Sequence, residues 1–349
     1  MEPTANNTLQ DQPTDSRATK QGLTNRIFIT IGVYLIAIFL LILGIILQTA
    51  GAINNFLTGQ NMINIIDAVS MLGIVSVGMA FVTYSGHYAD LSVPTTMALT
   101  GTVAVEMLKF GFWPAIIIAL AVGMVIGLIN AIAVGKFKAN PIIWTLALNY
   151  VTLGIIRLVW VNKQIYPDMT ASTVRASEMF DAIFRLRFFD TIALPMVMML
   201  VLVIILQFVL RKTKFGAQLK MTGAARTPAR FSGVNVELII GIAFIICAIT
   251  ATIGGLTVTS LNRVGAWYNG EGYDFRAVTA VVIGGVTLAG GRGSIVGVLG
   301  GVLVIGILNN IMTLLGIGTF SQDMVRGIIF IIVVYVNARS LRKMGRDYE

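Results

Sequence analysis

The fold is decided by the segment Arg211–Val236, which reads RKTKFGAQLKMTGAARTPARFSGVNV and separates two long apolar runs. It contains six basic residues and no acidic residue. Lys and Arg resist translocation, so a segment of this kind is typical of the cytoplasmic side of a membrane protein. Its second half predicts a short helix ended by glycine. Such a helix, exposed in the cytoplasm, would be a docking site for a soluble partner.

The composition of the whole chain predicts an integral membrane protein. Hydrophobic residues make up 56% of it and charged residues 12%, about half the charge of a soluble domain. We attribute the net charge of +9 to membrane topology rather than to nucleic-acid binding. The single cysteine, Cys247, lies in an apolar run and is interpreted as a small core residue. Residues 1–26 are polar and predict a disordered cytoplasmic tail.

Apolar runs of roughly 20 residues predict the membrane spans. Two further segments, Leu91–Leu108 and Phe275–Leu288, are short and interrupted, and they bring the predicted total to ten. We therefore expect an all-α polytopic membrane protein with a permease domain over residues 27–338. The eight clear runs are Ile27–Gln48, Ile63–Tyr84, Trp113–Val134, Ile142–Val161, Ile192–Leu210, Leu238–Thr259, Gly297–Leu315 and Met324–Val336.

The distribution of basic residues predicts the orientation of the spans. With the amino terminus inside, 16 of the 25 Lys and Arg residues fall on the cytoplasmic side. The loop of residues 162–190 would then be periplasmic, and residues 339–349 would form a basic cytoplasmic tail. The opposite orientation would translocate the basic segment 211–236. Both termini are therefore expected in the cytoplasm.

The two interrupted segments indicate an internal repeat. Gly86–Gly101 can be laid over Gly285–Gly300, and each is a glycine-marked break that leads into a helix rich in small residues. An odd number of spans separates the halves, so the repeats would be inverted, as in many transporters that have broken helices. Small residues also recur in unrelated membrane helices, which leaves a chance similarity open. Later landmarks of the repeat are Asn130 with Asn309, and Gly154 with Gly327.

Polar residues within the apolar regions are candidates for a translocation path. Asp90, at the first break, could bond a hydroxylated substrate or cap the following helix, and the capping role is favoured. The asparagines could equally bond between helices, and the two aromatics could form constrictions or simply pack. The candidates are His87, Asp90, Asn130, Trp144, Asn149, Asn309, Asn310 and Phe320.

No catalytic set or metal-ligand spacing is visible in the sequence. The glycine run Gly290–Ser294 lacks the Gly-Lys-Ser/Thr of a phosphate-binding Walker loop. We therefore expect no nucleotide site, no cofactor and no enzymatic activity in this chain.

Two stretches resemble a known family. Val282–Ser294, VIGGVTLAGGRGS, is similar to a signature of the ABC-importer permeases for ribose, xylose, galactose and related sugars, and of autoinducer-2 permeases. This group lies within the branched-chain amino acid and sugar permease superfamily. Ala229–Val236, ARFSGVNV, resembles the most similar part of the family's cytoplasmic coupling loop. The resemblance runs from about Ile63 to Val336.

This resemblance implies one membrane subunit of an importer. A second permease copy or a paralogue would complete the membrane part, and a periplasmic binding protein would deliver a sugar or similar small polar solute. ATP and Mg²⁺ would bind to separate cytoplasmic ABC ATPase subunits. By position, the ATPase would contact Thr222, Gly223, Ala225, Arg226, Ala229, Arg230, Ser232 and Gly233.

The chain departs from the family at two places. Pro228 replaces the usual alanine in the coupling loop, which could bend or shorten its helix. At the first break the family has Gly-Gly-Ile-Asp-Leu-Ser-Val-Gly, whereas residues 85–94 read SGHYADLSVP, with one residue inserted and proline in place of glycine. The substrate could therefore differ from an ordinary pentose or hexose.

A second interpretation is an ion-coupled secondary transporter. It would use Asp67, Asp90 or Asp323 to couple proton or sodium movement to transport. The inverted repeat fits both interpretations. The basic loop and the Gly-Gly-Arg-Gly-Ser run favour the ATP-driven importer.

Overall fold

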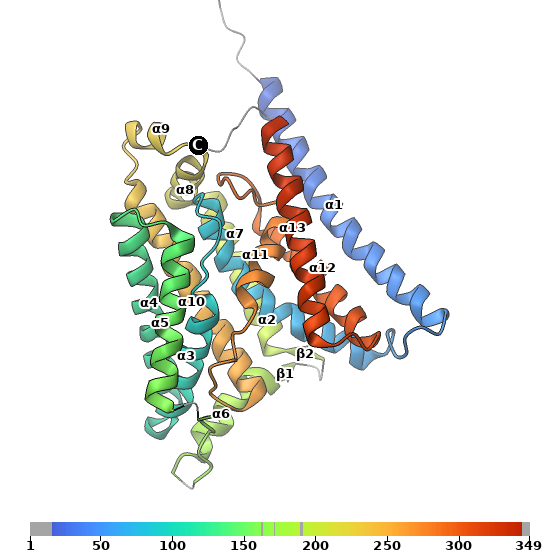
Figure 1. The fold of residues 1–349 in the computed structure, drawn as a ribbon, viewed down its shortest axis with the longest axis vertical. Coiled ribbons are helices and arrows are strands. Elements are labelled where there is room, and N and C mark those ends of the chain that lie inside the picture. Colours follow the sequence, from blue (N-terminus) through green and yellow to red (C-terminus); the bar gives the residue numbers. More distant parts are fainter. Residues whose placement is uncertain (1–15, 162, 171, 189–190, 344–349) are drawn as a thin grey trace, which may run out of the picture.

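The computed structural model describes residues 16–161, 163–170, 172–188 and 191–343, and these residues are almost entirely helical (Figure 1). Among them, eight helices are long and apolar enough to cross a membrane. They are α1 (Ser16–Thr49), α2 (Gly59–Tyr84), α4 (Phe112–Asn130), α5 (Pro141–Trp160), α7 (Leu194–Lys212), α10 (Val236–Asn262), α12 (Ile295–Leu314) and α13 (Thr319–Lys343). The expectation of an all-α polytopic membrane protein is confirmed.

The two interrupted segments of the sequence form α3 (Val93–Met107) and α11 (Tyr273–Ile283). With 15 and 11 residues, both are shorter than the roughly 20 residues that span a bilayer. The count of ten crossings therefore stays a prediction. The remaining elements are η1 (Leu108–Phe110), η2 (Ala131–Lys136, a π-helical turn), α6 (Val174–Arg185), β1 (Arg187–Phe188), β2 (Ile192–Ala193), α8 (Lys214–Ala224) and α9 (Arg226–Phe231).

Three predicted boundaries are wrong. Helix α1 begins at Ser16, so residues 16–26 are helical rather than disordered, and residues 1–15 lie outside the described residues. Helix α13 continues to Lys343, so only residues 344–349 of the predicted carboxy-terminal tail lie outside the described part. Ile192 belongs to β2, which pairs antiparallel with β1, and not to the start of α7.

The centre of the bundle is the crossing of α2 and α10, and α2 is the most buried of the eight long helices. Glycines allow the two helices to approach closely. A Cβ at Gly78 would lie 1.7 Å from Thr250 Oγ1, and one at Gly254 would lie 2.5 Å from the Val75 side chain. In lipid, helix association has no hydrophobic driving force and depends on close van der Waals packing, which small residues at the crossing allow. The α2–α10 pair thus forms a core around which the other helices are arranged.

The packing of the helices reveals an internal repeat, and each of its two copies contains four helices. Helix α10 packs on α2, α3 and α4, whereas α2 packs on α10, α11 and α12. Helix α3 also packs on α5, as α11 packs on α13. The pairs α2/α10, α3/α11, α4/α12 and α5/α13 therefore occupy equivalent positions.

This pairing corrects the predicted alignment of the repeat. The break before α3 is equivalent to residues 263–272 before α11, and not to residues 284–294, which precede α12. The later landmarks agree with the packing, because Asn130 and Asn309 lie in α4 and α12, and Gly154 and Gly327 in α5 and α13. The glycine run resembled the first break because both end a helix by backbone turns with positive φ.

Helices α8 and α9 lie at the end of the bundle where α1 begins and α13 ends (Figure 1). Helix α6, from the predicted periplasmic loop, lies at the opposite end (Figure 1). The basic segment and the two helical termini therefore share one side of the molecule.

Candidate functional site

The first break, residues 85–92, is an ordered turn between α2 and α3. Gly86 has φ of 79°, and Tyr88 adopts φ of 51°, which is uncommon for a residue with a side chain. The hydroxyl of Thr83 donates a hydrogen bond to the Tyr88 carbonyl oxygen at 2.7 Å. The break is therefore stabilised by the helix that it ends.

Asp90 is the centre of a buried polar cluster and is 1% exposed. Its Oδ1 accepts hydrogen bonds from the Ser92 backbone N–H (2.9 Å) and hydroxyl (2.6 Å), and its Oδ2 accepts one from Asn130 Nδ2 at 3.2 Å. Asp90 does not cap α3, because the N-cap residue is Ser92 and no side chain accepts a capping hydrogen bond there. Asp90 instead fixes the start of α3 by binding the backbone N–H and hydroxyl of the N-cap residue Ser92, whereas a capping side chain would bind the amide of N2 or N3.

Helix α5 docks onto this cluster through three side chains. Trp144 Nε1 donates to Asn130 Oδ1 at 3.1 Å, and the Leu91 backbone N–H donates to Thr145 Oγ1 at 3.0 Å. Asn149 Oδ1 accepts a hydrogen bond from Thr95 Oγ1 at 2.9 Å. The structure therefore brings Asp90, Asn130 and Trp144 into one network and places Asn149 beside it.

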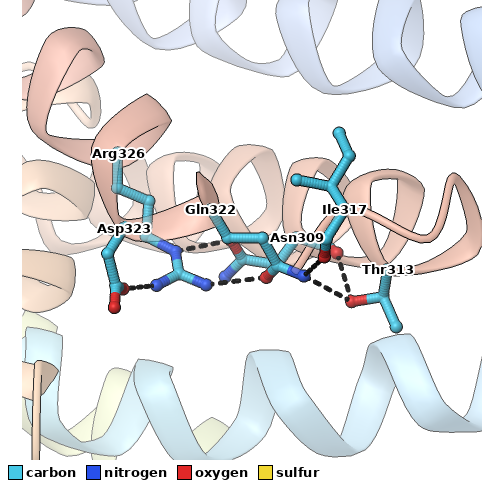
Figure 2. Close-up of polar contacts among 6 residues, drawn as sticks. All are labelled: Asn309, Thr313, Ile317, Gln322, Asp323 and Arg326. Carbon is cyan, nitrogen blue, oxygen red and sulfur yellow. Dashed lines mark hydrogen bonds and ion pairs between the residues drawn. The ribbon is translucent and has the colours of Figure 1, made fainter. Parts of the chain in front are cut away.

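Asn309 belongs to a second cluster, between α12 and α13 (Figure 2). Its Oδ1 accepts a hydrogen bond from Arg326 Nε at 2.9 Å, and the same guanidinium contacts Asp323 and donates to Gln322 Oε1 at 2.9 Å. Gln322 Nε2 in turn donates to the Ile317 carbonyl oxygen at 2.9 Å and to Thr313 Oγ1 at 3.3 Å. This cluster holds the α12–α13 turn.

The remaining predicted path residues lie elsewhere. Asn310 exchanges reciprocal amide hydrogen bonds with Asn61 of α2, at 2.7 and 3.0 Å. Phe320, near the start of α13, is 92% exposed. The eight candidates do not meet at one point, and their role in a path stays a prediction.

The carboxylates proposed for ion coupling all have partners in the described residues. Asp67 is buried and forms an ion pair with Arg187 at 2.7 Å. Asp323 contacts Arg326, and Asp90 accepts the three hydrogen bonds described above. Each carboxylate therefore has a structural role.

The predicted short helix in the basic segment is α9. Gly233, with φ of 78°, follows it, and the amides of Gly233 and Val234 donate to the carbonyls of Arg230 and Ala229 at 2.9 and 3.1 Å. This pair of bonds is the Schellman motif that commonly ends a helix. Pro228 does not kink α9, because it lies in the first turn, where a backbone N–H would have no partner within the helix.

The end of α8 packs between the first break and the glycine run 290–293. A Cβ at Gly223 would lie 1.9 Å from the Tyr84 carbonyl oxygen and 2.5 Å from the Gly291 nitrogen. Gly291 N–H itself donates to the Tyr84 carbonyl at 2.9 Å, and a Cβ at Gly290 would meet the Gly86 nitrogen at 2.7 Å. The backbones of α8, the first break and the glycine run 290–293 are therefore in direct contact. We call this contact the glycine junction.

Burial divides the predicted coupling residues into two groups. Thr222 and Ala229 are each 1% exposed, and Gly223 packs against the backbone of Tyr84 and Gly291, so these three face the bundle, and their contact with an ATPase stays a prediction. The residues on the outer side of the segment are Ala225, Arg226, Arg230, Ser232 and Gly233. Arg230 forms an ion pair with Glu237 at the start of α10.

His87 links this segment to the first break. Arg226 Nη2 lies 3.0 Å from His87 Nε2, and His87 Nδ1 lies 2.8 Å from Ser85 Oγ. A guanidinium can only donate, so Nε2 accepts and the proton of the neutral ring is on Nδ1. Burial, followed by the positive charge of Arg226, lowers the pKa of His87 from 6.5 to about 3, which keeps the ring neutral.

A cavity of about 810 Å³ lies beside this contact. The first break, the α4–α5 connection, the α8–α9 segment and the start of α10 form its wall. Its charged lining consists of Lys138, Arg226, Arg230 and Glu237, so its net charge is positive.

The sequence reasoning missed two functional candidates. Phe231 in α9 is 89% exposed, and an aromatic residue within a basic polar segment was the available signal. Ser85 links His87 to α2, since its hydroxyl donates to the Val82 carbonyl at 2.7 Å. No sequence pattern indicated this role.

Comparison with known proteins supports the architecture. Residues 61–334 match the family model described as branched-chain amino acid transport system / permease component. The chain is 31% identical to the ribose import permease protein RbsC of Bacillus subtilis over 334 residues, covering 95% of this chain and 98% of the relative.

Two further relatives are from Escherichia coli K12. RbsC is 32% identical over 81% of this chain and 87% of the relative, and the L-arabinose transport system permease protein AraH is 32% identical over 80% and 83%. No solved structure matches significantly. The chain belongs to the family of permease components of the branched-chain amino acid transport system type.

Proposed function

We propose that this protein is the membrane subunit of an ATP-driven importer that translocates a sugar or a similar small polar solute. The observation that carries the proposal is the contact of the α8–α9 segment with the first break and with the glycine run 290–293. A soluble motor that binds α9 could displace the first break and the glycine run through this contact. An ion-coupled transporter would not need such a segment.

The motor would be a cytoplasmic ABC ATPase that binds ATP and Mg²⁺. The exposed Phe231, the exposed side of α9 and the net positive charge of residues 211–236 support a docking surface for it. The side that carries α9 and both helical termini would then be cytoplasmic, in the inner membrane of a bacterium.

Two further partners complete the proposal. A periplasmic binding protein would deliver the solute to the opposite side, which carries α6. A second permease copy, or a paralogue, would pack against the exposed helices α5 and α13, which are equivalent in the repeat and are among the least buried of the long helices.

The substrate class follows from the relatives. Their names describe import of ribose and transport of L-arabinose. His87 in the altered first break lines the cavity, and Pro94 lies in the first turn of α3. We therefore propose a monosaccharide or a related polar solute rather than one particular pentose.

The test is reconstitution of the permease with its ATPase into proteoliposomes that contain ATP and Mg²⁺. Uptake should require ATP and loaded binding protein. Replacement of Phe231 by Asp should abolish co-purification of the ATPase while membrane insertion is retained. The matched control is Phe110→Asp, because Phe110 is also an exposed phenylalanine (64%), lies in η1 and is outside the α8–α9 segment.

Uptake by the purified permease alone, driven by a proton or sodium gradient, would contradict the proposal. Normal ATPase binding by Phe231→Asp would show that α9 is not the docking surface.

A further inference from the structure

We propose that His87 is a positioning residue that transmits movement of α9 to the first break, through the directed chain Arg226–His87–Ser85. The proposal rests on the proposed function, since it assigns a residue to the coupling step. It extends that function to a side chain that lies outside the coupling segment and has no counterpart in the family's usual first-break motif.

The direction of the hydrogen bonds defines the chain. Arg226 Nη2 donates to His87 Nε2, Nδ1–H donates to Ser85 Oγ, and the Ser85 hydroxyl donates to the Val82 carbonyl in the last turn of α2. His87 and Ser85 each accept one hydrogen bond and donate one in the same direction, from Arg226 toward the Val82 carbonyl. The imidazole therefore connects the first residue of α9 to the end of α2.

The surroundings of the ring allow it to transmit displacement. His87 is 4% exposed, and its ring packs edge-on against Phe244 of α10 with centroids 6.1 Å apart. Arg226, by contrast, is an exposed residue at the start of α9. The Arg226 end of this hydrogen-bonded series is thus accessible to a docked protein, and the Ser85 end is fixed in the core.

The glycine junction supplies an independent second contact. Gly223, three residues before Arg226, already packs against the Tyr84 carbonyl. A movement of α8 and α9 would therefore press on the end of α2 through the backbone and pull on the break through His87. The side-chain link adds a tensile connection that packing cannot provide, because van der Waals contacts resist compression and resist separation only weakly.

The first test examines the link without any transport partner. His87 is the only histidine of the chain, so ¹⁵N-histidine labelling gives a single imidazole. In the purified permease, Nδ1 should show the shift of a protonated nitrogen and Nε2 that of an acceptor. Arg226→Met should change the Nε2 shift. A ring with its proton on Nε2 would overturn the proposal.

The second test measures coupling in the complete complex, and begins by establishing that the wild type imports solute with ATP. In His87→Phe, ATP hydrolysis stimulated by loaded binding protein should fall by about tenfold, within the range of typical allosteric couplings. His87→Gln, which keeps an acceptor for Arg226, should restore most of the stimulation. Tyr88→Phe is the matched control in the same break.

A double-mutant cycle separates coupling from a purely structural role. The variant with both His87→Phe and Arg226→Met should be no worse than either single variant, because each removes the same link. Independent, multiplying losses would overturn the proposal, as would unchanged stimulation in His87→Phe. Failure of the wild type to import would instead contradict the proposed function, while the NMR result would still stand.

Discussion

Single residues decide how the helices of this bundle end. Asp90 fixes the start of α3 through Ser92, and Gly233 ends α9. Gly223 permits backbone contact of α8 with the end of α2 and with the glycine run 290–293. Asp and Gly at such positions were recognisable from the sequence. The role of His87 was not, because its partners Arg226 and Phe244 lie far from it in the chain.

A pH dependence follows at this scale from the buried His87. In the unfolded chain the imidazole of His87 has its ordinary pKa of 6.5, whereas in the folded protein its pKa is about 3. The unfolded state therefore binds more protons between these values, so lowering the pH destabilises the fold. At about pH 5.5 the free energy of unfolding should be roughly 1 kcal/mol lower than at pH 7.5. Thermal melting in detergent should show this loss in the wild type and not in His87→Gln.

Two glycines provide a matched pair of substitutions. In Gly223→Ala the new Cβ would clash with backbone atoms, 1.9 Å from Tyr84 O, and no side-chain rotation can relieve this. We expect a loss of about 3 kcal/mol or failure to fold. Gly233→Ala meets open space and carries only the strain of φ at 78°, about 1 kcal/mol. Equal melting temperatures for the two variants would refute this reasoning.

At the scale of elements, the hydrogen bonds of α5 explain how a largely exposed helix is held in the bundle. Its inward side bonds to the first break, to α3 and to α4 through Thr145, Asn149 and Trp144. The sequence predicted the span Ile142–Val161 to within one residue of α5 at each end. The sequence did not predict which face of α5 bonds to the bundle, because this face is set by the positions of α3 and α4.

Asn130 is expected to be the most important of these contacts. Asn130→Ala would remove the partners of Asp90 Oδ2 and Trp144 Nε1 together. Each buried group left unpaired costs about 1–3 kcal/mol. Asn149→Ala should cost less, because Thr95 Oγ1 can still donate to the Ser92 carbonyl at 3.2 Å. Thermal denaturation of both variants in detergent would rank them, and the reverse order would contradict the network.

At the scale of the whole molecule, the repeat has the same packing in both halves but different polar chemistry. The cluster at α3–α5 is built around the acidic Asp90, and the cluster between the equivalent helices α12 and α13 around the basic Arg326 (Figure 2). The two halves have thus diverged in charge while keeping the helix arrangement.

The orientation of the whole molecule can be tested by cysteine labelling. Cys247 is the only cysteine and is fully buried, so background labelling should be low. Phe231→Cys and Phe320→Cys introduce thiols at positions that are 89% and 92% exposed. An impermeant maleimide should label position 320 in intact spheroplasts and position 231 only after the membrane is opened. The opposite pattern would invert the proposed topology.

The sequence by itself determined the class of fold, the long spans and the basic segment that contains α9. These depend on local quantities: apolar length, charge and the backbone freedom of glycine. Only the tertiary structure decided the alignment of the repeat, the separation of the eight path candidates and the partners of His87. Hydrogen bonds between distant segments depend on how helices cross, and a crossing is set by complementary surfaces that no single stretch of sequence contains.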